Sequence, residues 1–190
     1  MLVELNELNK SYHNGVFEVA ALKNINLKIN KGEFTVFAGP SGSGKTTLLN
    51  IVGTMDKLSS GEVRVDGIEL SALSKNEASD FRKDKIGFIF QSYNLIPVLT
   101  VYENVEFILD LVGKFTKLEK ELKINTLLEE LGLLEYKNRK PSELSGGQQQ
   151  RVAIARALIK EPLIVLADEP TANLDSKTGE NILDLMKKLN

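Results

Sequence analysis

The segment GPSGSGKTT, residues 39–47, is the feature that most constrains how this chain can fold. Its three glycines free the backbone for a tight curl. The apolar run FTVFAG at 34–39 leads into it, and TTLLNIVGTM at 46–55 follows with the spacing of a helix. A short apolar run is typical of a strand that is buried on both faces. A buried strand that enters a helix through a glycine-rich turn is a building unit of α/β proteins.

Further strands and helices are predicted along the rest of the chain. Apolar and polar residues alternate, as in strands with one solvated face, over 2–8 and 24–34. Residues 61–70 predict a β-hairpin, with Asp66 and Gly67 as its turn. Short apolar runs that predict buried strands also occupy 85–91 and 162–170. Helical spacing covers 100–134, with a break near Gly132, and 176–190. We therefore expect an α/β fold with a mostly parallel sheet, an N-terminal antiparallel β layer and an inserted helical subdomain.

The glycine-rich segment matches the pattern G-x-x-x-x-G-K-[ST] of a phosphate-binding P-loop at Gly39, Gly44, Lys45 and Thr46. A chance glycine-rich turn is the alternative, but a strand before the pattern and a helix after it are the context that supports the motif. In such a loop, backbone N–H groups and the helix N-terminus face the phosphates. Lys45 reaches the β- and γ-phosphates, and the Thr46 hydroxyl holds Mg²⁺. The candidate phosphate-binding residues are Gly39, Pro40, Ser41, Gly42, Ser43, Gly44, Lys45, Thr46 and Thr47.

Two acids follow the apolar run that ends at Ala167. Asp168 is placed at a strand end, where it is expected to hold Mg²⁺ through water beside the phosphate loop. Glu169 points elsewhere, and a carboxylate there can orient or deprotonate the water that attacks the γ-phosphate. The alternative is that Asp-Glu-Pro simply marks a turn from strand to loop.

Composition excludes several other kinds of site. The 190 residues include no cysteine, which excludes a disulfide framework and a thiolate metal site. His13 is the only histidine, which excludes a multi-histidine metal site. The net charge of −2 argues against binding nucleic acid through bulk charge. The N-terminus is acidic and no apolar run is long enough for a membrane span, so we expect a soluble intracellular protein.

The order of the motifs resembles that of the ATP-binding cassette (ABC) ATPases, the motor subunits of ABC transporters. The motifs are GPSGSGKTT, the glutamine of FIFQSYN at 88–94, LSGGQ at 144–148, LADEP at 166–170 and ANLDS at 172–176. The resemblance covers residues 2–190 and is strongest to the subgroup that serves macrolide export and lipoprotein release. It implies ATP and Mg²⁺ as ligands and ATP hydrolysis as the reaction, with Glu169, Gln91 and Lys45 as catalytic residues.

The resemblance also implies a partner for the second glycine-rich helix start, at Ser145, Gly146, Gly147 and Gln148. In the family two cassettes pair head-to-tail, and the signature motif of each, which is LSGGQ at 144–148 here, caps the γ-phosphate that the other copy's P-loop binds. The expected partner is therefore a second copy of this chain in a C₂ dimer around two ATP molecules. The alternative is a plain helix cap by the serine.

Three further residues match family positions. The resemblance implies that Gln91 touches Mg²⁺ and the attacking water, that Tyr12 stacks on adenine, and that Asp175 communicates across the dimer. Each has a simpler alternative: Gln91 as a strand-end residue, Tyr12 as surface packing, and Asp175 as the N-cap of the last helix.

The expected organisation is a single cassette. Residues 1–91 and 141–190 form the nucleotide-binding core, and 92–140 form the helical subdomain. The apolar run at 95–99 predicts a docking patch, and the resemblance implies that the 92–105 region contacts an integral membrane permease. The alternative for 95–99 is packing on its own core. We expect a cytoplasmic protein that is peripheral on the inner face of the cell membrane.

The chain departs from the family pattern at its C-terminal end. Family members continue past the last helix into another buried strand and a histidine that contacts the γ-phosphate, whereas this chain stops at Asn190. His13 lies near the expected adenine site and cannot substitute. We therefore expect a truncated chain that binds ATP, hydrolyses it poorly and self-associates. A regulatory ABC ATPase without transport, and a nucleotide-binding module with little hydrolysis, remain alternatives.

Overall fold

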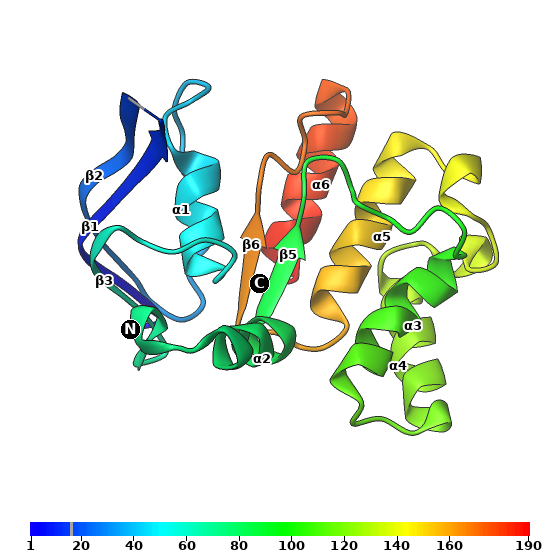
Figure 1. Cartoon of the computed structure of the whole chain (residues 1–190). Coiled ribbons are helices and arrows are strands. Elements are labelled where there is room, and N and C mark those ends of the chain that lie inside the picture. The colour runs from blue at the N-terminus through cyan, green and yellow to red at the C-terminus, as the bar shows by residue number, and fades with distance from the viewer. Residues whose placement is uncertain (16) are drawn as a thin grey trace. The chain divides into compact units, whose positions relative to one another are not determined.

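A computed structural model describes residues 1–15 and 17–190 (Figure 1). The chain divides into two compact units. Unit 1 comprises Met1–Arg82 with Asn190, and unit 2 comprises Lys83–Leu189. The boundary falls inside helix α2 (Lys75–Lys85), which the sequence analysis did not predict.

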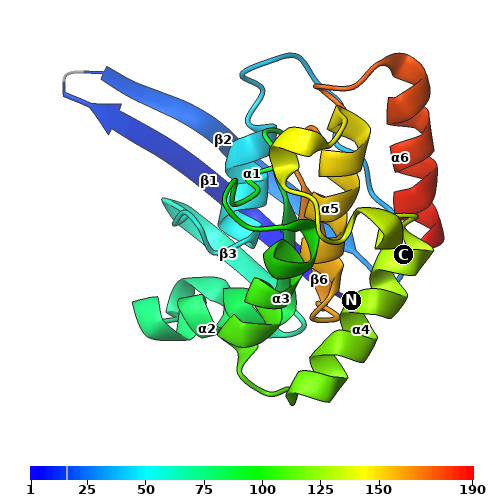
Figure 2. The same ribbon diagram turned by 90° about the vertical axis from the view of Figure 1, so that its right-hand side faces the viewer.

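An antiparallel sheet forms the frame of unit 1. Its strands are β1 (Val3–Asn14), β2 (Phe17–Ile29), β3 (Ser60–Val65) and β4 (Ile68–Glu69), in the order β2-β1-β3-β4. The predicted antiparallel layer is thus confirmed, and β1 and β2 form a long ribbon (Figure 2). The predicted turn at Asp66 and Gly67 is also confirmed: both residues have a positive φ, of 50° and 78°, as a two-residue hairpin turn requires.

Helix α1 (Lys45–Val52) follows the phosphate loop, and the apolar face of the sheet forms the core of unit 1. The helix buries its apolar residues Leu48, Leu49, Ile51 and Val52. The sheet contributes Val3, Leu5, Leu8, Val63 and Val65, each no more than 1% exposed. This burial fixes the start of α1, and with it the end of the phosphate loop.

The segment 34–39 is a loop, so the prediction of a buried strand there is wrong for this structure. Val36 is 71% exposed, and no strand of the described residues pairs with the segment. A strand needs neighbours for its backbone N–H and C=O groups. The side chains of the apolar run favour burial, but they do not provide the neighbouring strands that its backbone needs.

Unit 2 contains a parallel pair of strands, β5 (Ile86–Ile89) and β6 (Ile164–Ala167), with Ile86 opposite Ile164 and Ile89 opposite Ala167. Both strands were predicted. Helix α5 (Gly146–Leu158) packs directly on β5, and α6 (Ser176–Lys188) packs on α5 (Figure 1). A Cβ at Gly87 would lie 2.6 Å from the carbonyl oxygen of Ala157, so the strand and helix can approach this closely only with glycine there.

The predicted helical region at 100–134 is two helices, α3 (Val101–Val112) and α4 (Lys117–Glu130). Each begins with a capping box, Thr100 with Glu103 and Thr116 with Glu119. The break between them was not predicted, although T-x-x-E is a signal for a helix start. Short 3₁₀ helices are η1 (Leu70–Ala72), η2 (Leu134–Tyr136) and η3 (Pro141–Glu143). Across the described residues, every helix is too short or too polar to cross a membrane.

Candidate nucleotide-binding site

The loop at 39–47 curls around the ammonium group of Lys45. Lys45 Nζ donates hydrogen bonds to the carbonyl oxygens of Gly39, at 2.8 Å, and Pro40, at 3.0 Å. The backbone N–H of Ser43 donates to the Pro40 carbonyl at 3.3 Å and closes the turn. The loop therefore holds a positive charge at its centre, directly before the N-terminus of α1, as an anion site requires.

Gly44 is the residue that the loop geometry most depends on. Its φ is +90°, and a Cβ there would lie 2.6 Å from the carbonyl oxygen of Ala21 and 2.8 Å from Leu22 Cδ2. Strand β2 thus packs closely against the loop where it enters α1. Both the backbone conformation and the lack of space require glycine.

Two helix N-termini differ from the others in charge. Among the six α-helices of the described residues, four have a carboxylate at or near their start: α2 has Glu77, α3 has Glu103, α4 has Glu119 and α6 has Asp175. Helices α1 and α5 have no acid in the first turn. Among the α-helices of the described residues, the positive end of the dipole is therefore left without an internal anion in α1 and α5, whose N-termini lie in glycine-bearing motifs.

Tyr12, on β1, lies beside the end of the phosphate loop. Its hydroxyl donates to Asp56 Oδ2 at 2.6 Å, and the nearby Thr47 side chain acts on the pKa of the same hydroxyl. The hydrogen bond to the Asp56 carboxylate, together with partial burial, raises the pKa of Tyr12, so the phenol stays neutral at ordinary pH. The structure thus brings the predicted adenine-stacking residue and the predicted phosphate site together within unit 1.

The two predicted acids of unit 2 follow β6. The backbone N–H of Asp168 donates to the carbonyl of Ile89 at 2.9 Å, so this residue extends the parallel ladder by one bond. Glu169 leaves the ladder with a φ of +46° and an exposed side chain. A positive φ is strained for a residue with a Cβ, and such strain clusters at functional sites. The two carboxylates thus have different surroundings, and their roles toward Mg²⁺ and water stay predictions.

The loop after β6 holds Gln91 in place. Asn173 Nδ2 donates to the backbone carbonyl of Gln91 at 2.9 Å, and the N–H of Ala172 donates to the carbonyl of Glu169 at 3.1 Å. Gln91, Glu169 and Asn173 therefore belong to one hydrogen-bonded group of loops in unit 2. Asn173 was not among the predicted site residues, although it lies inside the ANLDS motif.

Arg156, on α5, is a residue that the sequence analysis missed. Its guanidinium donates to the carbonyl oxygens of Asn94 and, at 2.9 Å, of Tyr93. Both acceptors have positive φ values, of 49° and 57°, in the turn that follows Gln91. Burial lowers the pKa of Arg156 from its usual value. The forked guanidinium thus holds a strained turn against the helix that the signature motif begins.

Replacing Arg156 with alanine is expected to lower the free energy of unfolding by about 1–3 kcal/mol, because carbonyl acceptors in a strained turn lose their donor. Urea unfolding followed by circular dichroism measures the change. Arg139 is the control: it is exposed and its guanidinium lies 5.0 Å from the Tyr136 ring, and its replacement by alanine should change stability by less than about 0.5 kcal/mol. Equal losses for the two variants would contradict the assigned role.

The signature segment forms a capping box at the start of α5. Ser145 Oγ accepts from the N–H of Gln148 at 3.3 Å, and Gln148 Oε1 accepts from the N–H of Ser145 at 2.8 Å. A Cβ at Gly146 would lie 3.1 Å from the Tyr93 hydroxyl, and one at Gly147 would lie 2.7 Å from Thr178 Cγ2. The cap alternative thus accounts for Ser145 and Gln148, and close packing gives a local reason for both glycines. The role across a dimer stays a prediction.

Asp175 is the N-cap of α6, as its simpler alternative stated. Its carboxylate accepts from the N–H of Thr178 at 3.0 Å, and the hydrogen bonds from the side chain and backbone of Thr178 lower the pKa of Asp175. A role in communication across the dimer is compatible with this cap and remains a prediction.

The predicted docking patch is organised around a buried amide. Asn104 is fully buried, its Oδ1 accepts from the N–H of Ile96 at 2.8 Å, and its Nδ2 donates to the carbonyls of Ile96 and Leu99, both at 3.1 Å. Leu95 packs on the core of unit 2, as the alternative stated, whereas Val98 is 71% exposed. The loop is therefore fixed in shape, and it presents the apolar side chains of Pro97 and Val98 outward.

The predicted Mg²⁺ donors are all oxygen atoms: the Thr46 hydroxyl in unit 1, and the Asp168 carboxylate and Gln91 amide in unit 2. Such hard donors fit Mg²⁺, which is bound by few protein ligands together with water and phosphate. Within the described residues, no three His, Cys, Asp or Glu side chains gather into a site that could hold a metal by themselves. The donor set fits an ion that arrives with its nucleotide.

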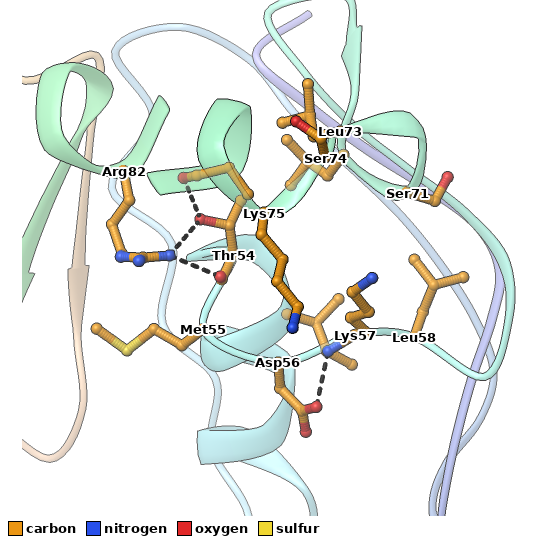
Figure 3. Close-up of a pocket in the computed structure, with 13 residues that line it drawn as sticks. Thr54, Met55, Asp56, Lys57, Leu58, Ser71, Leu73, Ser74, Lys75 and Arg82 are labelled. Atoms are coloured by element: carbon orange, nitrogen blue, oxygen red, sulfur yellow. Dashed lines mark hydrogen bonds between the residues drawn. The ribbon is translucent and has the colours of Figure 1, made fainter. Parts of the chain in front are cut away.

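Unit 1 also contains a cavity of about 630 Å³ beside the turn that follows α1 (Figure 3). It is lined by residues 54–58 of that turn, by η1 and by the start of α2. Arg82 closes one side, where its guanidinium donates to the carbonyl of Thr54 at 2.8 Å. No sequence pattern indicated this cavity.

Comparisons with known proteins agree on one family. A sequence profile described as "ABC transporter" matches residues 22–172. The chain is 52% identical, over its whole length and 82% of the relative's, to the uncharacterized ABC transporter ATP-binding protein MJ0796 of Methanocaldococcus jannaschii. It is 48% identical to the macrolide export ATP-binding/permease protein MacB of Mannheimia succiniciproducens, over 99% of this chain and 29% of that protein.

The structure resembles a solved cassette equally well. The dimeric structure of a post-hydrolysis state of the ATP-binding cassette MJ0796, bound to ADP and Pi, matches with a TM-score of 0.89 at 50% identity. The match covers 99% of this chain and 82% of that one. This likeness confirms the predicted α/β fold class at the level of the whole cassette.

Proposed function

Because this chain belongs to the ABC transporter family of ATP-hydrolysing cassettes, we propose that two copies close around two ATP molecules and that hydrolysis drives a membrane permease. One observation carries the proposal beyond the family. The N-termini of α1 and α5 have no internal acid, whereas the other helices of the described residues do. Each of these two helix ends suits the phosphates of a nucleotide.

The proposed roles follow from the chemistry of each residue. Lys45, now hydrogen-bonded to loop carbonyls, turns its ammonium to the β- and γ-phosphates of ATP. Thr46, Gln91 and Asp168 hold Mg²⁺, which neutralises charge that develops on the phosphates when it is bound. Glu169 orients the attacking water and accepts its proton.

The proposed partner in the site is a second copy of this chain. The related MJ0796 cassette forms a dimer, and a C₂ dimer presents the same two surfaces of each copy to the other. In the proposed dimer, Ser145, Gly146, Gly147 and Gln148 of one copy face the γ-phosphate held by residues 39–47 of the other. Asp175 lies at the same junction.

The membrane partner is proposed to be a permease that docks on residues 92–105. The exposed Val98 and the fixed loop around Asn104 support this assignment. The cassette would then act at the inner face of the membrane as a peripheral subunit. We also propose that residues 1–91 and 141–190 form the nucleotide-binding core and that 92–140 form the helical subdomain.

The shared site is tested by mixing two inactive variants. Lys45→Ala removes the phosphate contact, and Ser145→Arg places a bulky side chain on the exposed signature surface. Each variant alone has two damaged sites per dimer. In a mixed dimer both defects fall in one site and the other site is intact. Phosphate release should therefore rise, when equal amounts are mixed, to a quarter or so of the native rate, as expected from random pairing with one working site in two.

The control mixes Lys45→Ala with Thr46→Ala, which damages the phosphate loop in both sites and should restore nothing. If the first mixture releases no more phosphate than the separate variants, the head-to-tail dimer is excluded. If the control mixture recovers as well, subunit exchange does not explain the recovery and the proposed arrangement is wrong.

A further inference from the structure

From the contacts around Tyr12 we propose that Asp56 is a positioning residue for the nucleotide base. The inference rests on the proposed function, ATP binding, and adds to it the predicted stacking of Tyr12 on the adenine. Asp56 acts through Tyr12 and Lys10 and does not itself reach the base. These residues and the loop at 39–47 all belong to unit 1.

The Asp56 carboxylate uses both of its oxygens. Oδ2 accepts from the Tyr12 hydroxyl at 2.6 Å, and Oδ1 accepts from Lys10 Nζ at 2.8 Å and from the backbone N–H of Lys57 at 2.7 Å. Bonds of this length to an ionised acceptor are charge-assisted and strong. Three donors fix the plane of the carboxylate, and the carboxylate in turn fixes the hydroxyl end of the Tyr12 ring.

Lys10 covers part of the same ring. Its ammonium lies 4.6 Å from the centre of the Tyr12 ring and donates to the Lys57 carbonyl at 2.7 Å, and the residue is only 9% exposed. A cation at this distance from an aromatic face is held there by the ring electrons. Tyr12 keeps 42% of its surface exposed, which leaves ring surface for a base.

The position of Asp56 is itself set by the turn after α1. The backbone N–H groups of Met55 and Asp56 both donate to the carbonyl of Asn50, at 2.8 and 3.1 Å. Arg82 holds the neighbouring Thr54 from the other side of the turn (Figure 3). Asp56 therefore stands on a backbone that two elements anchor, which suits a residue that positions another.

The end of the phosphate loop lies beside the same ring. Thr47, in the first turn of α1, is close enough to the Tyr12 hydroxyl to influence its pKa, and the same hydroxyl donates to Asp56. A ring fixed relative to the phosphate site presents base and phosphate contacts at one constant separation. ATP then binds without the entropy loss of ordering the tyrosine side chain.

The charges persist at the pH of the cell. Burial by itself raises the pKa of Asp56, but the hydrogen bonds from Lys10, Tyr12 and the Lys57 backbone outweigh it and leave that pKa below its ordinary value. The Asp56 carboxylate therefore stays ionised, and the raised pKa of Tyr12 keeps its hydroxyl a donor.

The test compares two ligands by isothermal titration calorimetry: ATP, which has a base, and inorganic tripolyphosphate, which has none. Asp56→Ala and Tyr12→Phe should weaken ATP binding about three- to tenfold, the range expected for ordering one side chain on binding. Tripolyphosphate affinity should change less than about twofold. Tyr12→Phe removes the hydroxyl but keeps the Lys10–Asp56 ion pair. It therefore still tests the proposal if Asp56→Ala does not fold. Tyr12→Ala removes the stacking ring itself.

Glu62→Ala is the matched control. Glu62 pairs with Arg64, and its side chain is 32% exposed against 29% for Asp56. It lies on β3, in the sheet that also carries Tyr12 on β1. This variant should bind both ligands as the native chain does.

The outcomes separate the inference from the function it rests on. If Tyr12→Ala weakens only ATP while Asp56→Ala and Tyr12→Phe bind it normally, the positioning role is wrong and the stacking stands. Equal weakening of both ligands by Asp56→Ala and Tyr12→Phe shows a general structural effect and also overturns the role. If Tyr12→Ala leaves the ratio of the two affinities unchanged, the stacking itself is wrong and the inference falls with it.

Discussion

Replacing Glu169 with glutamine is expected to lower phosphate release about a hundred- to ten-thousandfold, the usual contribution of a general base, while ATP binding is retained. Glutamine keeps the size of the side chain and its hydrogen-bonding oxygen, but it does not accept a proton at neutral pH. ATP that cannot be hydrolysed should hold two copies together. Size-exclusion chromatography with light scattering, in Mg²⁺ and ATP, should therefore show a stable dimer.

Glu161→Gln is a matched control for this experiment. Glu161 is also an exposed glutamate of unit 2 with a positive φ, of 54° against 46° for Glu169, but it follows α5 and pairs with Lys123. This variant should hydrolyse ATP at the native rate and should not accumulate as a dimer. A Glu169→Gln chain that stays monomeric with ATP would count against the closed dimer, and one that turns over normally would remove Glu169 from the reaction.

Local patterns predicted the elements whose signals lie within a few residues. The hairpin at Asp66 and Gly67, the helix after the phosphate loop and the two strands β5 and β6 all have such signals. The segment 34–39 shows the limit. Its apolar run has the composition of a buried strand, but pairing depends on residues elsewhere in the chain, and the described residues provide no partner strand.

The residues of the candidate site also differ in how far the sequence could predict them. Residues inside a motif, such as Lys45 and Glu169, could be named because their chemistry requires a fixed spacing in sequence. Arg156 and Asp56 could not. Arg156 bonds carbonyls 62 and 63 residues away, and Asp56 accepts from a hydroxyl 44 residues away. Nothing in the sequence near either residue indicates these partners, because only the fold brings them together.

Replacing Gly44 with alanine is expected to weaken ATP binding more than any other single methyl group added to the phosphate loop. The backbone at φ +90° costs a residue with a Cβ roughly 1–2 kcal/mol. The new Cβ would also lie 2.6 Å from the Ala21 carbonyl oxygen, and such overpacking costs roughly 1–3 kcal/mol. The free chain can relieve both by shifting the loop. Bound ATP requires the original shape, so affinity should fall roughly thirtyfold to several thousandfold, at tenfold for each 1.4 kcal/mol.

Gly42 supplies the comparison that isolates the contact with β2. Its φ is +78°, but a Cβ there meets nothing within 4 Å. Gly42→Ala therefore carries the backbone strain without the steric clash, and its affinity for ATP should fall only about five- to thirtyfold. Calorimetric titration of both variants with ATP measures the difference. Equal losses of ATP affinity would mean that backbone strain alone governs the loop. The packing of β2 against Gly44 would then not help to shape the phosphate site.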